Sequence, residues 1–217
     1  MHCIITAGPT FEPLDEVRRL TNFSTGRLGA ELASFLSARG HQTTLLIGQQ
    51  ATYRANAHAT HVQFFTSTAD LRAQLQALAT QPADAVFHAA AVSDFGFGKV
   101  WRRGPQGELT EVKSGKLSTR QGTLLAELVP TPKIIAGLRQ WFPTARLVGW
   151  KYEVDGDRAG AIGLAQTQIA ECHTNACVAN GPAYGAGFGL VTSGGQCTHL
   201  PDHAALFQAL ECLASTL

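Results

Sequence analysis

The chain has 217 residues, enough for a domain with a substantial core, and its 45% hydrophobic and 15% charged residues exclude an intrinsically disordered protein. The formal net charge of +1, without a basic tract, argues against proteins that bind nucleic acids or anionic membrane surfaces. No apolar stretch approaches the roughly 18 residues of a membrane span. The N-terminus also lacks the long apolar run of a secretory signal, so we expect a cytoplasmic protein.

The first part of the chain alternates short apolar runs with segments of helical periodicity. The first run ends in Ala7-Gly8-Pro9-Thr10, which predicts a strand followed by a tight turn. The run Ala83–Ala91 has no polar alternation, which is typical of a parallel strand covered on both faces. Apolar spacing predicts strands at 3–6, 42–47, 61–65 and 83–91, and helices at 25–37 and 69–78.

The pattern changes after Asp94 and then resumes. Gly96–Arg120 is polar and rich in glycine, which predicts a flexible active-site loop with at most a short hairpin. Beyond it we expect strands at 124–129, 146–151, 176–179 and 189–192, and helices at 132–141, 159–171 and 202–217. This alternation predicts a single α/β domain over residues 1–217. Its expected fold is Rossmann-like and doubly wound, with a mostly parallel sheet and helices on both faces.

Three segments leave predicted strands at the edge of the sheet where ligands bind. In an open parallel sheet this edge is formed by the carboxyl ends of the strands. The segments are Gly8–Thr10, Ala89–Phe95 and Lys151–Glu153. We therefore expect them to converge on one site.

The stretch Arg18–Gly29 places polar side chains just before a helix start, and its two glycines, Gly26 and Gly29, allow close approach of the backbone. Unpaired N–H groups and the helix dipole favour anions there, although an ordinary Ser/Thr helix cap explains the same residues. The first strand is followed by Gly-Pro-Thr and not by G-x-G-x-x-G, which argues against an NAD site.

Two further candidates follow. Lys113 and Lys116 could close over a polyphosphate, or they could be surface lysines of a solvated loop. Asp94 directly follows a buried strand end, where its carboxylate could accept from a ribose hydroxyl or a base, or could cap the loop.

Histidine and cysteine spacing predicts no metal site in the protein itself. The eight histidines show no metal-ligand spacing, and His88 ends a buried run, so we interpret it as a hydrogen-bonded core residue. The five cysteines show no C-x-x-C pair and are expected to be reduced, mostly buried thiols, rather than nucleophiles.

The polar segments together resemble the phosphopantothenate–cysteine ligase (phosphopantothenoylcysteine synthetase) family over nearly the whole chain. The resemblance rests on Ile5–Arg18 (I-T-A-G-P-T-x-E-P-L-D-x-V-R), Asn22–Ala30 (N-F-S-T-G-R-x-G-A), Ala89–Phe95 (A-A-A-V-S-D-F), Lys113-x-x-Lys116 and Leu128–Pro132 (L-V-P-T-P). It implies a stand-alone ligase domain that joins 4′-phosphopantothenate and cysteine through an acyl nucleotidylate made from CTP or ATP. It also implies a homodimer in which a loop covers the site.

The resemblance implies a role for each matched residue. Asn22 donates to the acyl carbonyl, while Lys113 and Lys116 stabilise phosphoryl charge together with a Mg²⁺ ion carried by the nucleotide. The acid substrate is assigned to Arg18, Ser24, Thr25, Gly26 and Ala90. The nucleotide is assigned to Gly8, Pro9, Thr10, Ala89, Asp94, Phe95, Val129, Pro130, Thr131, Pro132, Trp150 and Lys151.

The chain departs from the family pattern where the nucleotide is expected. The bacterial cytidine-nucleotide enzymes carry lysines near Gln168 and Cys172, and none stands between Lys151 and the C-terminus here. Trp150-Lys151-Tyr152-Glu153 is closer to the eukaryotic, ATP-using branch, and Lys151 could replace the missing charge. The choice between CTP and ATP therefore stays open.

Two other functions compete with a ligase. The thinned lysines would suit a divergent, non-catalytic relative that binds a nucleotide or a pantothenate derivative as a sensor or scaffold. A short-chain-type NAD(P) oxidoreductase shares the fold class, but the sequence lacks its glycine fingerprint and a Tyr-x-x-x-Lys pair.

Overall fold

The computed structural model describes residues 1–53 and 58–216, and within them the centre of the molecule is an eight-stranded sheet. Its order is β13-β12-β11-β10-β6-β1-β4-β5, parallel from β11 to β5, with β12 and β13 added antiparallel. The strands are β1 (His2–Ala7), β4 (Gln42–Gly48), β5 (His61–Phe65), β6 (Ala85–His88), β10 (Arg146–Tyr152), β11 (Ala176–Asn180), β12 (Phe188–Thr192) and β13 (Cys197–Leu200).

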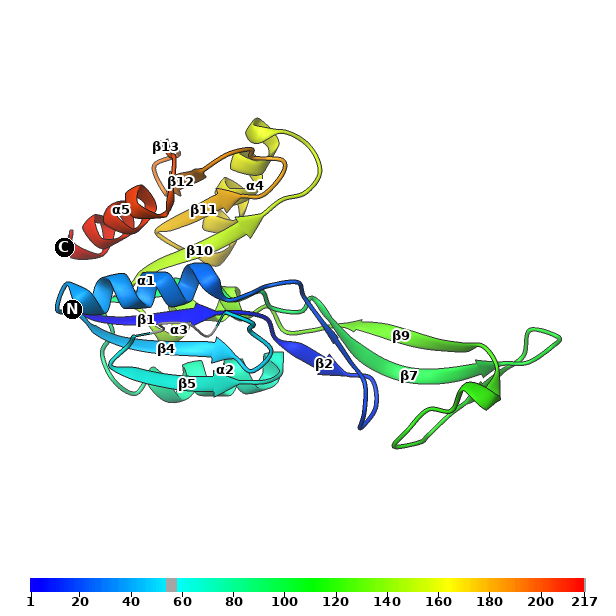
Figure 1. Ribbon diagram of the computed structural model, residues 1–217. Helices are drawn as coiled ribbons and strands as arrows, with labels where there is room; N and C mark the ends of the chain where they lie inside the picture. Colours follow the sequence, from blue (N-terminus) through cyan, green and yellow to red (C-terminus); the bar gives the residue numbers. More distant parts are fainter. Residues whose placement is uncertain (54–57, 217) are drawn as a thin grey trace.

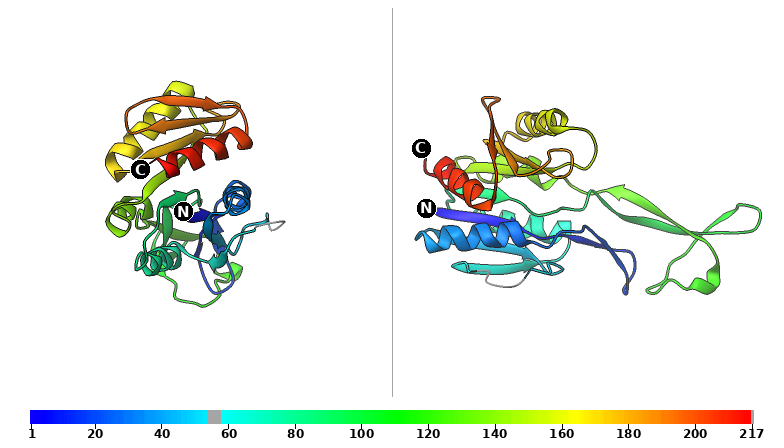
Figure 2. Two further views of the ribbon diagram at one scale, coloured as in Figure 1. Left: turned by 90° about the vertical axis from the view of Figure 1, so that its left-hand side faces the viewer. Right: turned by 45° about the horizontal axis from the view of Figure 1, so that its top comes forward.

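Helices cover both faces of this sheet, as predicted (Figures 1 and 2). On one face lie α1 (Arg27–Ala38) and α5 (His203–Ser215), and on the other α2 (Thr68–Leu78), α3 (Ile134–Trp141) and α4 (Arg158–Cys172). Neighbouring residues of β1 point to opposite cores: Ile5 packs with α1, and Ile4 packs with α2 and α3. This two-sided burial is why the strands are continuous apolar runs.

The strand order reverses beside β1, which creates the crevice for a ligand. From β1 the chain continues to β4 and β5 on one side, and then crosses to β6 on the other side of β1. The segments that follow β1 and β6 stay paired for a few residues, since Ala91 N–H donates to Gly8 O and Thr10 N–H to Ala91 O. They then diverge, and such a switch point is where open α/β sheets bind ligands.

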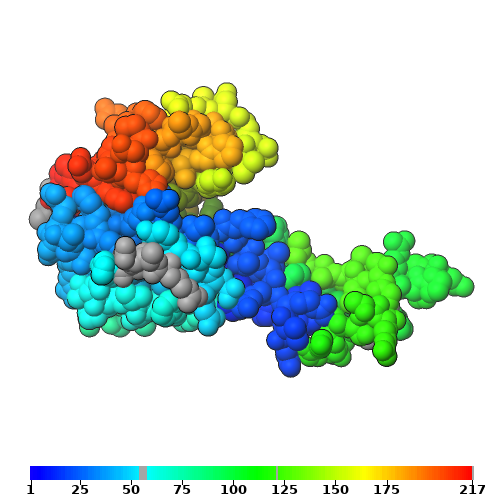
Figure 3. Space-filling view, viewed as in Figure 1, coloured from blue at the N-terminus to red at the C-terminus, as the bar shows by residue number. Residues whose placement is uncertain are grey.

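An antiparallel arm extends from this edge of the body (Figures 1 and 3). It consists of β7 (Phe95–Arg103), β8 (Leu109–Glu111) and β9 (Leu124–Pro130), with the short helix η1 (Thr119–Gln121) before β9. A hairpin of β2 (Phe11–Pro13) and β3 (Arg19–Thr21) packs at its base.

The arm corrects the prediction of a loop with at most a short hairpin over 96–120. The nine-residue β7 pairs with the nearby β8 and also with β9, which is distant in sequence, so the glycine-rich segment is part of a three-stranded sheet. The predicted strand at 124–129 is confirmed, but it belongs to the arm and not to the central sheet. Propensity could not reveal this pairing, because it is non-local.

The remaining differences concern element ends. The run predicted as a strand over 83–91 is a strand only over Ala85–His88, because the following residues form the site. The helix predicted from Pro132 begins at Ile134, and β13 was not predicted. The C-terminal helix predicted over 202–217 spans His203–Ser215, and Leu217 lies outside the described residues. None of the helices in the described part of the chain is long and apolar enough to span a bilayer.

Candidate functional site

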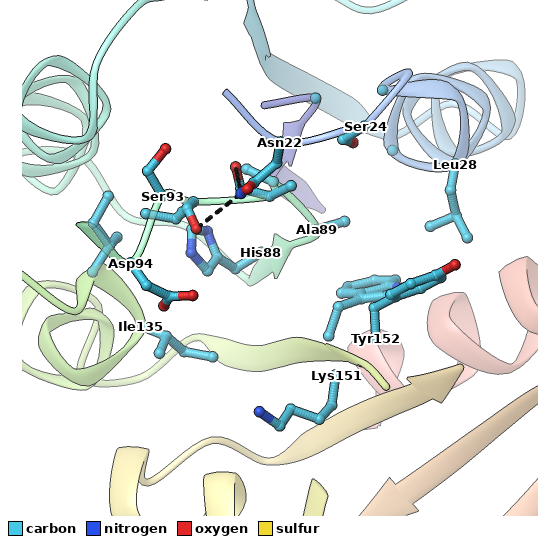
Figure 4. Close-up of a pocket in the computed structure, with 18 of the residues that line it drawn as sticks. Asn22, Ser24, Leu28, His88, Ala89, Ser93, Asp94, Ile135, Lys151 and Tyr152 are labelled. Carbon is cyan, nitrogen blue, oxygen red and sulfur yellow. Dashed lines mark hydrogen bonds between the residues drawn. The ribbon is translucent and has the colours of Figure 1, made fainter. Parts of the chain in front are cut away.

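A cavity of about 940 Å³ lies at the carboxyl ends of β1, β6 and β10 (Figure 4). Its size is that of a site for a nucleotide-sized ligand. The three segments predicted to converge do so, since Gly8, the stretch from Ala89 to Asp94, and Lys151 all line it. Within those segments Pro9, Thr10, Phe95 and Glu153 lie outside the lining.

The start of α1 forms one wall of the cavity, and glycines bring it close to β1. Gly26 precedes the helix in the left-handed region (φ 79°), and a Cβ on Gly29 would lie 2.6 Å from the Cβ of Ala7. Gly26 has no side chain to cap the helix, and the first turn carries no acidic residue. The unneutralised helix start therefore favours an anion.

The start of α3 lines the same cavity and has the same character. Its first turn has no side-chain cap and no acidic residue, whereas α2, α4 and α5 are each capped by a side chain. Those caps are Ser67, Asp157 and Asp202. The two uncapped helix starts thus both contribute to one cavity, where a bound anion would accept hydrogen bonds from their free N–H groups.

Asn22 is held at the mouth of the crevice by the chain that follows β6. Its Nδ2 donates to the carbonyl oxygens of Ala91 and Val92, each at 3.2 Å (Figure 4). The side chain is exposed and lines the cavity. Donation to a ligand therefore requires one amide proton to exchange a backbone carbonyl for the ligand.

His88 lies on the cavity lining as well as in the core. Its Nδ1 is 2.9 Å from Oγ1 of Thr6, confirming the prediction of a hydrogen-bonded core residue. Burial lowers the pKa of His88 to about 4, so the imidazole is neutral near pH 7. Its contact with the cavity was not predicted.

Three cations line the cavity, and sequence reasoning assigned only one of them to a ligand. Lys151 was predicted, whereas Arg27 and Lys133 were not. Each is paired with a carboxylate outside the lining, at 2.6 Å for Arg27–Glu31, 3.0 Å for Lys151–Glu153 and 3.6 Å for Lys133–Glu171. Asp94 is the acidic residue among the described lining residues, so a polyanion in the cavity would meet three cations and would compete with their paired carboxylates for them.

Two lining residues have a buried polar atom without a hydrogen-bond partner. These atoms are Nε1 of Trp150 and Oδ1 of Asn180. Buried polar atoms are rarely left unpaired in folded proteins, so they mark places that a ligand or an ordered water would complete. Gln168 also lines the cavity, whereas Cys172 is buried in the core behind it.

The predicted site residues divide into two groups. Those that line the cavity are Gly8, Asn22, Ser24, Thr25, Gly26, Ala89, Ala90, Asp94, Thr131, Pro132, Trp150 and Lys151. Those that the same chain does not bring to it are Pro9, Thr10, Arg18, Phe95, Lys113, Lys116, Val129 and Pro130. The second group belongs mostly to the arm and the hairpin at its base.

The arm holds its cationic residues in a defined arrangement. Lys113 is 85% exposed and pairs with Glu111 at 3.6 Å. Arg18 donates to the carboxylate of Asp15 and to Leu117 O, while the N–H of Leu117 donates to Asp15. The segment around Leu117 is thereby tied to the hairpin.

The described residues show neither a cluster of three possible metal ligands nor an ionised buried thiol. They contain no group of three His, Cys, Asp or Glu side chains that could hold a metal ion. Cys3, Cys172 and Cys177 are buried, whereas Cys197 and Cys212 are exposed. Burial raises the pKa of Cys3 to about 11 and that of Cys177 to about 12, so these thiols stay protonated.

Comparison with known proteins identifies similar sequences and folds. Over residues 1–199 the chain matches the family described as DNA/pantothenate metabolism flavoprotein C-terminal domain. It is 32% identical over 177 residues to the coenzyme A biosynthesis bifunctional protein CoaBC of Thermococcus kodakarensis. That match covers 82% of this chain and 40% of the relative, so the chain spans less than half of the length of that protein.

Two solved structures share the fold. The DNA/pantothenate metabolism flavoprotein from Streptococcus pneumoniae superposes with a TM-score of 0.84 at 24% identity, covering 97% of this chain and 96% of that one. A Cab2 mutant in complex with phosphopantothenate-cysteine superposes with a TM-score of 0.68 at 18% identity, covering 99% and 89%. At these identities the likeness concerns the fold alone.

Proposed function

Because the chain belongs to the family of DNA/pantothenate metabolism flavoprotein C-terminal domains, we propose that it is a phosphopantothenate–cysteine ligase of coenzyme A biosynthesis. One observation carries the proposal. A single cavity joins Asn22, Asp94, Lys151 and two uncapped helix starts at the switch point of the sheet. That combination suits a carboxylate and a nucleoside triphosphate bound side by side. The name of the relative, a coenzyme A biosynthesis protein, and the phosphopantothenate-cysteine bound in the Cab2 complex support the same substrates.

The first step forms a mixed anhydride. A carboxylate oxygen of 4′-phosphopantothenate attacks the α-phosphorus, and the bond to the bridging oxygen breaks, so that pyrophosphate leaves with both bonding electrons. Negative charge accumulates on the phosphoryl oxygens, where Lys151 and the N–H groups at the two helix starts stabilise it. A Mg²⁺ ion carried by the triphosphate neutralises part of the remaining charge.

The second step forms the amide. The cysteine nitrogen attacks the acyl carbon, loses a proton, and the acyl C–O bond breaks to release the nucleoside monophosphate. Asn22 donates from Nδ2 to the acyl oxygen as negative charge develops on it, replacing its bond to Ala91 or Val92. The Asn22 side chain already lines the cavity, so the required change is the exchange of one of these two hydrogen bonds.

The nucleotide can be either CTP or ATP on this proposal. Trp150, with its unpaired Nε1, and Asn180, with its unpaired Oδ1, supply one donor and one acceptor on the lining. Such groups discriminate between bases when the wrong base leaves them unpaired. Measuring both triphosphates therefore belongs in the first assay.

The active assembly is a homodimer, in which the arm of a second copy supplies Lys113. The arm extends from the body (Figure 1). Lys113 on the arm is exposed and does not line the cavity of its own chain. Leu109, Leu128 and Val129 expose apolar surface on the arm, at 52%, 55% and 46%. A small sheet of this kind needs a second layer for stability, which a second copy supplies.

The test is pyrophosphate release and product formation with 4′-phosphopantothenate and cysteine, in parallel with CTP and ATP. We expect Asn22→Ala to keep first-step pyrophosphate release and to lower product formation about 100- to 1000-fold. Lys113→Ala should slow the first step itself, because it removes charge that stabilises the leaving pyrophosphate. Binding of both substrates by the wild type without any pyrophosphate release would instead indicate a non-catalytic relative.

A further inference from the structure

The lining of the cavity contains a buried histidine to which the proposed mechanism gives no role. We propose that His88 donates a hydrogen bond from Nε2 to an anionic oxygen of the bound substrates, carried either by the acid or by the triphosphate. The identity of these ligands rests on the proposed function. His88 is thus a binding and positioning residue for the reacting groups, and its donor is supplied by a neutral ring.

The contacts of Thr6 determine which ring nitrogen carries the proton. The N–H of Ala90 donates to Thr6 Oγ1 at 3.1 Å, and the same oxygen lies 2.9 Å from Nδ1 of His88. Thr6 is fully buried, and the described residues offer its hydroxyl proton no acceptor other than Nδ1. If Nδ1 carried the proton, the Thr6 hydroxyl would lose its acceptor, at the cost of a buried unsatisfied donor. Nδ1 is therefore the acceptor, and Nε2 carries the hydrogen.

The protonated nitrogen is available to a ligand. Within the described residues no protein group forms a hydrogen bond with Nε2. This nitrogen is not among the fully buried polar atoms without a partner, so it is accessible to solvent. The residue is only 6% exposed, and it lines the cavity, so the accessible part of the ring opens into the cavity. In the view of Figure 4 the ring lies between Asn22 and Lys151.

A neutral donor suits this position between groups of opposite charge. Asp94, Lys133 and Lys151 line the same cavity. A charge on the buried His88 ring would be poorly solvated. Because burial keeps the ring neutral, it can donate without competing with the lysines for counter-ions. A donor held in place by a second hydrogen bond also needs little reorganisation when the ligand binds.

Paired substitutions test the donor. His88→Phe removes both ring nitrogens and keeps an aromatic volume, whereas His88→Gln retains an N–H donor close to the position of Nε2. We expect His88→Phe to lower kcat/KM about 10- to 100-fold and His88→Gln to restore it to within about fivefold of the wild type. Equal losses in two variants that unfold at the wild-type temperature would overturn the proposal, since packing alone would then explain them.

Nitrogen-15 spectra of the histidine rings test the proposal in the unmutated protein. Without ligand we expect the His88 signals of a neutral ring protonated at Nε2 from pH 6 to 9. Adding 4′-phosphopantothenate alone, and in a separate sample CTP or ATP with Mg²⁺, should shift the Nε2–H signal with one of them and so identify the compound that carries the accepting oxygen. An Nδ1-protonated ring, or saturation with both compounds without a shift, would overturn it even if the ligase assay succeeds. A wild type that releases no pyrophosphate but shows the shift would overturn only the proposed function.

The hydroxyl of Thr6 offers a matched pair for the tautomer. Thr6→Ser keeps the hydroxyl that donates to Nδ1, and Thr6→Val removes it at nearly constant volume. We expect the Nε2-protonated signal to persist in Thr6→Ser and to give way to a mixture of tautomers in Thr6→Val. Identical spectra in both variants would show that Thr6 does not set the tautomer and would contradict the argument.

Discussion

At the residue scale, Lys133 is a side chain of the cavity lining whose charge is available to a bound polyphosphate. It precedes α3 without capping it, lines the cavity, and pairs with Glu171 of α4 at 3.6 Å. Together with Lys151 it places positive charge on the lining of the cavity. The side chain is 63% exposed, so solvent weakens its ion pair in the free protein and leaves the ammonium group available to a polyphosphate.

We predict that Lys133→Met raises the KM for the triphosphate about tenfold and leaves kcat within about twofold, because a charge-assisted contact to phosphate is lost. The measurement is steady-state pyrophosphate release at saturating 4′-phosphopantothenate. Glu171→Gln is the matched control, since it breaks the ion pair but keeps the cation. An equal rise in KM in the control would mean that Lys133 acts only by joining α3 to α4.

At the element scale, the hairpin of β2 and β3 connects the arm to the site. Asp15 lies in its turn and accepts from the N–H groups of Val17, Arg18 and Leu117 as well as from the Arg18 side chain. The hydrogen bond from the Arg18 side chain, together with those backbone N–H groups, holds the pKa of Asp15 well below its usual range. Because the folded-state pKa is lowered, the stabilisation is fully present above the usual carboxyl value of about 4 and is lost only as the pH falls through the lower folded value.

We therefore predict that the contact between Asp15 and Leu117 does not change between pH 5 and 8, and that Asp15→Asn weakens it at every pH in this range. Hydrogen exchange of the Leu117 amide, corrected for intrinsic rates, should accelerate roughly tenfold in the variant. Glu16→Gln, a neighbouring charge change without these contacts, should leave it unchanged. Unaltered exchange in Asp15→Asn would show that other contacts hold the arm to the hairpin.

At the scale of the whole molecule, the arm has too little of its own core to stand alone. Its strands leave Leu109, Leu128 and Val129 about half exposed, and Val17 of the adjoining hairpin is 62% exposed. A sheet with an apolar face is stabilised when another layer covers that face. The proposed homodimer would cover these side chains and bring Lys113 of one copy towards the cavity of the other.

The prediction at this scale is that the wild type sediments as a dimer, and that Leu128→Asp shifts it to a monomer and lowers turnover at least about tenfold. A carboxylate buried in an apolar interface without a partner is the physical reason. Leu164→Asp, which changes a leucine of α4 that is 44% exposed, should remain a dimer with wild-type turnover. A fully active monomeric wild type would contradict both the dimer and the role of Lys113.

The amino-acid sequence by itself determined most strands of the central sheet and the position of the cavity. Continuous apolar runs alternating with helical spacing specify parallel strands covered on both faces, and these are local patterns. The segments expected at the carboxyl ends of these strands do meet at one edge, where Gly8, Ala89–Asp94 and Lys151 line the cavity. Gly26 and Gly29 could be identified from the sequence as positions where the backbone approaches a neighbouring segment, because they lie at the start of a predicted helix.

Only the tertiary structure decided the arm, the distant position of Lys113, and the lining roles of Lys133 and His88. The pairing of β7 with β9 joins residues about thirty positions apart, and no periodicity in a short window encodes such a partner. Lys133 reaches the cavity because α3 packs beside α4, and His88 does so because Thr6 of a neighbouring strand orients its ring. Each of these features depends on which segments meet in space, and that is a property of the packed molecule.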